Sequence, residues 1–199
     1  MINKTGMLLA SLVIIALTWI NPIWPQEQAL HNSLTVIAFI ALAGYNKTYP
    51  MNRVQFGLIC LFLIVHSIAA RWLYSYVPYE QWFADLTGQS FKVLFHTERN
   101  HTDRFIHFLY GLCFTPTLIS YFKQRYQLQI HMAYKLSLMM IMVSSLCYEW
   151  FEWLIAITLS PEQAEAYNGQ QGDMWDAHKD MLLATIGCLV WWPVKTKCH

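Results

Sequence analysis

Acidic and histidine side chains recur at helical spacing inside segments of the chain that are otherwise apolar. Asp176 and Asp180 are four residues apart in DMWDAHKDMLLATIG, and Asp103 and His107 have the same spacing in TDRFIHFLYG. Residues four apart lie on one face of a helix. Carboxylates with an imidazole and without a thiolate favour a divalent cation such as Mg²⁺, Mn²⁺, Zn²⁺ or Fe²⁺. These side chains are therefore predicted to be metal ligands.

Two further acids and two arginines complete the predicted site. Glu149 and Glu152 stand three residues apart in CYEWFEW, and either could act as general base on a metal-bound water. Arg104 or Arg71 would hold an anionic group such as phosphate. Two arginines do not neutralise the five carboxylates of this site, so the sequence predicts either protonated acids or a bound cation.

The composition indicates the kind of element that must position these residues. The chain is 56% hydrophobic and 13% charged, whereas soluble domains carry about a quarter charged residues. A bilayer core takes about 20 apolar residues in a helix. We therefore expect an all-α membrane protein, a single domain built as a bundle of about six transmembrane helices. The predicted spans are residues 5–23, 31–45, 54–76, 103–122, 133–159 and 175–194.

The distribution of charge predicts the orientation of these spans. With the N-terminus inside, eight of the 13 basic residues fall at the inner ends, and all 12 acidic residues fall in the outer half or the outer loops. The positive-inside rule then places both termini in the cytoplasm. The basic residues are dispersed, which argues against a nucleic-acid partner. The eight inner basic residues are Lys4, Lys47, Arg53, Lys123, Arg125, Lys135, Lys195 and Lys197.

The outer connection, residues 77–100, is predicted to hold a short amphipathic helix in the outer interface. Apolar side chains such as Trp82 and Phe83 lie close to Glu80 and Asp85, a composition that suits the boundary between lipid and water.

Two features of the predicted spans concern packing. Gly111 and Gly187 fall at mid-depth, where small residues let helices approach closely. Pro116 removes a backbone donor from its span, and a neighbouring helix is expected to satisfy the freed carbonyl.

The depth of the charged residues favours a shared interior site. A charge near the bilayer centre costs about 2.5–3.5 kcal/mol on insertion scales, so these side chains are expected to face one another or water. The favoured function is a metal-dependent enzyme at the outer leaflet, a hydrolase or transferase on a lipid or lipid-linked substrate. A structural or regulatory subunit with a buried salt-bridge network is one alternative. A small ion-coupled transporter is another, although the inner halves of the spans carry almost no charge.

Three segments, ERNHTDRFIHFLYG, SSLCYEWFEW and QGDMWDAHKDMLLATIG, together resemble the YjdF-type family of bacterial inner-membrane proteins. The resemblance covers most of the chain, and its distinctive residues lie in the second half. It implies a multi-pass protein of the inner membrane, and it implies no reaction. The polar positions of the family correspond here to Asp103, Arg104, His107, Glu149, Glu152, Asp176 and Asp180.

Overall fold

The computed structural model describes residues 3–160, 164 and 167–192. All regular secondary structure in these ranges is helical, and they contain no strand. The all-α prediction is therefore confirmed for this part of the chain. The helices are α1 (Lys4–Leu17), α2 (Pro25–Thr48), α3 (Arg53–Ala70), α4 (Tyr79–Thr87), α5 (Phe91–Phe95), α6 (Thr102–Tyr126), α7 (Ile130–Thr158) and α9 (Asp176–Leu189).

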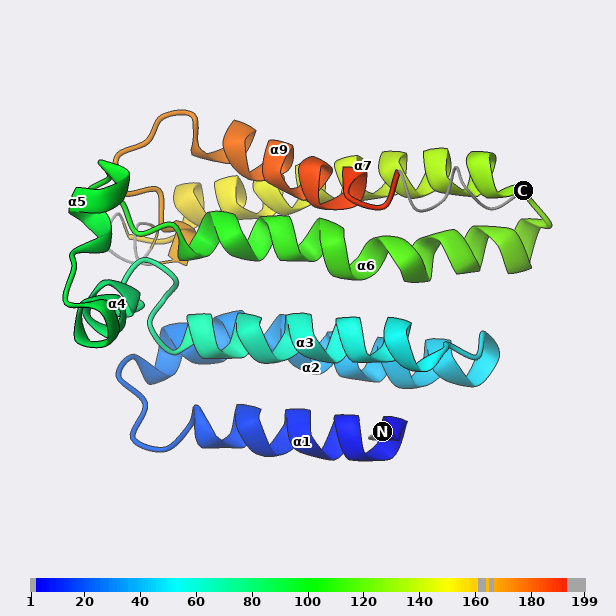
Figure 1. Cartoon of the computed structure of the whole chain (residues 1–199), viewed down its shortest axis with the longest axis horizontal. Helices are drawn as coiled ribbons and strands as arrows, with labels where there is room; N and C mark the ends of the chain where they lie inside the picture. The colour runs from blue at the N-terminus through cyan, green and yellow to red at the C-terminus, as the bar shows by residue number, and fades with distance from the viewer. Residues whose placement is uncertain (1–2, 161–163, 165–166, 193–199) are drawn as a thin grey trace.

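The long helices lie side by side and successive ones run in opposite directions, while α4 and α5 sit together at the end where α6 begins (Figure 1). Helix α6 contacts α3, α7 and α9, and α7 also contacts α9. On the other side, α3 contacts α1 and α2. Helix α6 is thus the element that joins the two groups.

Three of the described helices, α3, α6 and α7, are long and apolar enough to cross a membrane. Helix α1 is apolar but shorter, and α9 has 14 residues. Four of the six predicted ranges each overlap one helix, with ends that differ by several residues. Range 5–23 overlaps α1, 103–122 overlaps α6, 133–159 overlaps α7 and 175–194 overlaps α9. Residues 193–194 of the last range lie outside the described residues.

The second span was predicted too short, because the prediction for residues 31–45 followed the apolar run alone. Helix α2 begins at Pro25, a residue suited to the first helical position because its missing N–H is not needed there. The polar side chain of Gln28 is buried in this first part and donates from Nε2 to the carbonyl of Thr18 at 3.1 Å. Hydropathy does not detect this first turn of α2, because its polar side chain is buried through a hydrogen bond inside the bundle.

The predicted range 54–76 extends beyond the end of α3. Helix α3 ends at Ala70, and the chain then turns through Leu73 and Tyr74, whose φ angles are 47° and 57°. These left-handed conformations break the helix even though both side chains are buried.

The connection between α3 and α6, residues 77–100, contains two short helices where the sequence predicted one. Gly88, with a φ of 70°, ends α4 in the left-handed conformation. Glu80 then links the two helices, because its carboxylate accepts from the Ser90 hydroxyl at 2.6 Å and from the Lys92 backbone N–H at 3.1 Å.

Large apolar side chains cover the outward faces of the bundle. The exposed fractions are 58% for Val13 on α1, 70% for Ile40 on α2 and 55% for Val143 on α7. A soluble monomer rarely presents so many apolar residues in continuous faces. Contact with lipid accounts for this surface.

Helices α6 and α9 approach closely at two glycines. A Cβ atom on Gly111 would collide with the carbonyl of Ala184, and a Cβ atom on Gly187 would collide with the carbonyl of Phe108. The expected close approach of small residues is thus confirmed. It fixes how α9 lies along α6, and therefore which side chains of the two helices meet toward the α4 end.

Pro116 has the expected consequence one turn earlier in α6. The carbonyl of Leu112, four residues before the proline, loses its helical donor. The indole Nε1 of Trp191 donates to this carbonyl at 2.8 Å. A side chain that follows α9 therefore satisfies the freed group.

Candidate functional site

Asp103 and His107 on α6 meet Asp180 on α9 inside the bundle. One potential ligand atom from each of these buried residues lies within 4.8 Å of the other two. The four-residue spacing brings the first two together on α6, and the close packing of α9 against α6 adds the third. Three of the four residues predicted to hold a metal are therefore neighbours.

His107 lies between carboxylates on two helices. Its Nε2 is 3.7 Å from Oδ1 of Asp103, and its Nδ1 is 3.9 Å from Oε1 of Glu149 on α7. Both ring nitrogens thus face an acidic group, at separations longer than a hydrogen bond.

Two carboxylate oxygens at this point are buried and have no hydrogen-bond partner in the described part of the chain. They are Oδ1 of Asp180 and Oε1 of Glu149, and the two residues are 2% and 8% exposed. A buried ionised carboxylate is stable only when it is paired or bound to a metal. The free oxygens belong to the same group as Asp103 and His107, so the four residues offer acceptors that a cation could satisfy.

Asp176, the fourth predicted ligand, belongs to a different cluster. Its Oδ1 accepts from Nη2 of Arg99 at 2.5 Å, and Nη2 of Arg104 lies 3.6 Å away. Arg104 also pairs with Asp173, whose Oδ2 is 2.6 Å from Nζ of Lys179. Since α9 starts at Asp176, Asp173 lies before the helix.

The environment of Asp173, which lies outside the spanning helices, is strongly cationic. The Lys179 ammonium, the backbone N–H of Trp175 and the Arg104 guanidinium all donate to its carboxylate and hold the pKa of Asp173 well below its ordinary value. This carboxylate stays charged, and Arg99, Arg104, Asp173 and Asp176 form a cluster of ion pairs, which we call the arginine network.

Arg99 was missed by the sequence analysis, although its side chain makes three hydrogen bonds. Besides Asp176, it binds the carbonyls of Gly169, at 3.1 Å, and Gln170. It therefore ties the loop before α9 to the start of α6. One signal was available in the sequence, because Arg99 is among the few basic residues that fall at the outer ends of the predicted spans.

Arg71 does not join the carboxylates, and its predicted place beside them is wrong. Its guanidinium donates instead to the carbonyls of Thr18, Ile20 and Asn21 at 2.5, 3.0 and 3.2 Å. Helix α1 ends at Leu17, so carbonyls there lack helical donors. The five N–H groups of an arginine suit such a set of acceptors.

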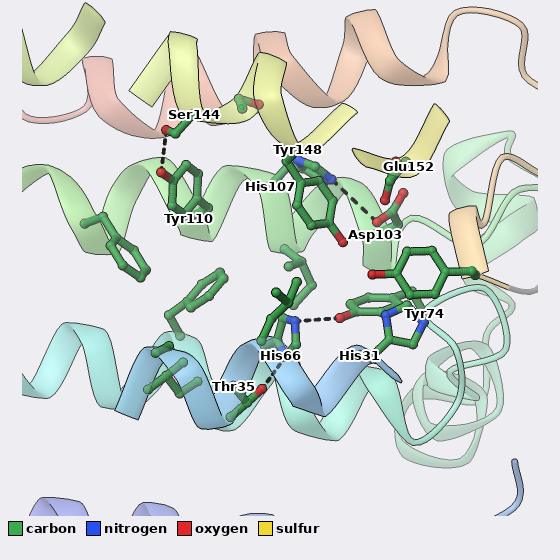
Figure 2. Close-up of a pocket in the computed structure, with 18 residues that line it drawn as sticks. His31, Thr35, His66, Tyr74, Asp103, His107, Tyr110, Ser144, Tyr148 and Glu152 are labelled. Carbon is green, nitrogen blue, oxygen red and sulfur yellow. Dashed lines mark hydrogen bonds and ion pairs between the residues drawn. The ribbon is translucent and has the colours of Figure 1, made fainter. Parts of the chain in front are cut away.

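A cavity of about 240 Å³ adjoins the carboxylates between the α2–α3 pair and the α6–α7 pair. Asp103, His107 and Glu152 line it, whereas Glu149 does not. Figure 2 shows Asp103 and Glu152 at one end and Tyr110 near the other, where its hydroxyl is 2.6 Å from that of Ser144. The cavity is therefore polar at the carboxylate end and largely aromatic beyond it.

These features define a helical membrane protein with a polar site between its helices. Residues 4–199 match the family described as "Predicted membrane protein (DUF2238)", so the chain belongs to this family of membrane proteins. The inner membrane protein YjdF of Escherichia coli K12 is 27% identical over 176 residues, which cover 87% of this chain and 75% of that protein. No solved structure matches the chain. The resemblance to the YjdF-type family is confirmed.

Proposed function

We propose that the protein binds one divalent cation through Asp103, His107 and Asp180, and that it is a metal-dependent enzyme acting on a lipid or lipid-linked substrate. The observation that carries this proposal is the meeting of three ligand atoms within 4.8 Å of one another. In addition, Oδ1 of Asp180 has no hydrogen-bond partner among the described residues. Tetrahedral bonds of about 2.1 Å separate neighbouring ligand atoms by about 3.4 Å. Small side-chain rotations would achieve this spacing.

The two glutamates would have different roles. Glu149 faces Nδ1 of His107 and does not line the cavity, so it would orient the imidazole, as carboxylates commonly do behind metal-bound histidines. Glu152 lines the cavity together with Asp103 and His107. When bound, the cation would acidify a water molecule, and Glu152 would accept the proton as general base.

The arginine network favours a second candidate function, that of a structural or regulatory subunit. Arg104, predicted to hold an anionic substrate group, is already paired with Asp173 and lies near Asp176. Its described contacts support a role in holding α9 against α6. On this evidence the network accounts for stability, whereas the Asp103–His107–Asp180 group is left without an equivalent structural explanation.

Replacing Glu152 with glutamine tests the proposed catalysis. Wild-type protein in vesicles of bacterial total polar lipid should convert one lipid species when supplied with Zn²⁺, Mn²⁺ or Mg²⁺, and a chelator should stop the conversion. Glu152→Gln should bind the cation normally and react about 10²–10⁴-fold more slowly, because it lacks the base. Lipid composition is measured by mass spectrometry. Loaded wild-type protein that converts no lipid would contradict the enzymatic function.

We further propose that α1, α2 and α9 complete a six-span bundle with both termini in the cytoplasm. The alternating helix directions (Figure 1) support this topology, because they bring Lys4, Lys47, Arg53 and Lys123 to the end opposite α4 and α5. Lys195 and Lys197 lie outside the described residues. The inner-membrane relative supports the same location.

The topology predicts which introduced cysteines an impermeant maleimide can reach in intact spheroplasts. The background variant replaces Cys147, the exposed thiol among the described residues, and Cys198, which lies outside them, with alanine. In this background Asp85→Cys on α4 should be labelled. Lys47→Cys at the end of α2 should be labelled only after lysis. The reverse pattern would contradict the proposed orientation.

A further inference from the structure

The cavity beside the proposed cation site contains a histidine that the site does not use. His31 on α2 lines the cavity and is 1% exposed, and neither of its ring nitrogens has a hydrogen-bond partner among the residues described. Its ring stacks on Tyr167 with centroids 4.3 Å apart. Stacking fixes the imidazole while both nitrogens remain available. A buried polar group in this state indicates a bound partner.

His66, the other histidine on this side of the cavity, is in the opposite state. Its Nδ1 is 3.2 Å from the Thr35 hydroxyl, and its Nε2 is 2.8 Å from the Tyr74 hydroxyl. Both nitrogens are therefore occupied by the protein. Figure 2 shows His31 and Tyr74 at the same end of the cavity as Asp103 and Glu152. The unpartnered nitrogens of His31 thus lie at the same end of the cavity as the two carboxylates.

The size of the cavity limits the ligand to a single narrow chain. Its volume of about 240 Å³ exceeds the about 150 Å³ that holds benzene in an engineered cavity. It falls below the about 300–1,000 Å³ of sites for drug-sized molecules. From Asp103 to Phe114, which both line it, α6 rises about 16 Å at about 1.5 Å per residue. A long, thin apolar group suits these dimensions, and a whole two-chain lipid does not.

The charges around the cavity select the group at the end of that chain. Asp103 and Glu152 line the cavity, and its lining contains no lysine or arginine among the described residues. Nearby Arg99 and Arg104 are paired with aspartates. In the cation-free protein, a phosphate would therefore meet carboxylates without a free cationic side chain. A hydroxyl group can donate to a carboxylate and accept from an imidazole N–H.

We propose that the cavity binds a single apolar chain ending in an uncharged hydroxyl group, with the hydroxyl at the His31 and Asp103 end and the chain extending toward Phe114. This assignment rests on the proposed function in taking the cavity as the substrate side of the cation site. It narrows the substrate to a long-chain alcohol or a lipid that presents one.

The probe for this inference is dodecan-1-ol carrying a photoreactive diazirine, applied to the full chain in nanodiscs. Ala38 lines the cavity from α2, so Ala38→Leu takes up cavity volume without changing the residues proposed to bind the hydroxyl or the cation. Ala41→Leu makes the same change on an exposed part of α2 and is the matched control. Labelling should fall about tenfold, or about 1.4 kcal/mol, in Ala38→Leu and remain at the wild-type level in Ala41→Leu.

His31→Phe keeps an aromatic ring for the stack on Tyr167 and removes both nitrogens, and it should also reduce labelling about tenfold. In protein kept cation-free with a chelator, unlabelled dodecan-1-ol should compete at least about tenfold better than dodecyl phosphate. Wild-type labelling in both Ala38→Leu and His31→Phe, or better competition by the phosphate, would overturn the inference. If Ala38→Leu does not fold, the labelling of His31→Phe and the competition between the alcohol and the phosphate test the inference without it.

Titration of the same proteins with Zn²⁺ separates this inference from the proposed function. Ala38→Leu and His31→Phe should bind Zn²⁺ as wild type does, because neither residue is a proposed ligand. Alcohol labelling that depends on His31 in a wild-type protein that binds no cation would sustain the cavity assignment and refute the cation site. Normal Zn²⁺ binding without labelling that depends on His31 would support the cation site and refute the cavity assignment.

Discussion

Asp180→Asn is expected to lower the affinity of the protein for Zn²⁺ or Mn²⁺ by more than about a hundredfold. Changes to residues that only support metal ligands already cost about 10–100-fold, and Asp180 is a proposed ligand whose Oδ1 has no other partner in the described structure. Asparagine keeps the shape of the side chain and removes its charge. Calorimetric titration of purified protein in detergent measures the affinities of both proteins.

The same substitution has a distinctive effect on stability. Without a cation, Asp180→Asn should be at least as stable as wild type, because a buried charge that lacks a partner has been removed. With cation at about 100 times its dissociation constant, wild type should gain about 2.7 kcal/mol and the variant should gain almost nothing. A cation-free variant that is less stable than wild type but binds the cation normally would make Asp180 a structural residue.

Asp176→Asn, one turn earlier on α9, is expected to give the opposite result. The side chains of Arg99 and Asp176 are 11% and 8% exposed, and breaking a buried pair from one side costs about 3–5 kcal/mol because the remaining charge is stranded. The free energy of unfolding should fall by this amount with or without a cation, while cation affinity changes little. Thermal or denaturant unfolding in detergent measures the loss.

Lys179→Met is the matched control for the arginine network. The Lys179 side chain pairs with Asp173 but is 46% exposed, and exposed pairs contribute only about 0–1 kcal/mol. Equal losses in Lys179→Met and Asp176→Asn would contradict the distinction between the buried pair and the surface pair. Loss of cation binding in Asp176→Asn would return that residue to the ligand set predicted from the sequence.

The part of the site that lies on one helix could be predicted from the sequence. Asp103 and His107 meet because helical geometry alone brings residues four apart together. The approach of Asp180 depends on tertiary packing, for which Gly111 and Gly187 gave an indication. The bundle interior was also predictable in kind, since charged residues at membrane depth must avoid lipid.

Features that depend on irregular backbone could not be predicted. Arg71 binds carbonyls that become available only where α1 ends, and Arg99 acts through the loop that precedes α9. Neither the end of α1 nor the loop before α9 has a periodic sequence pattern. The apolar count also failed at α2, where Gln28 is buried through a hydrogen bond to another segment. In each case a polar side chain donates a hydrogen bond to a backbone carbonyl of another segment.

The metal content of wild-type protein purified without chelator tests the central claim most directly. Elemental analysis should find about one divalent metal per chain, either as purified or after incubation with Zn²⁺, Mn²⁺, Fe²⁺ or Mg²⁺ and removal of the excess. The same treatment of Asp180→Asn should leave almost none, whereas Asp176→Asn should retain the wild-type amount. Wild-type protein that folds and holds no metal under any of these conditions would contradict the cation site formed by Asp103, His107 and Asp180.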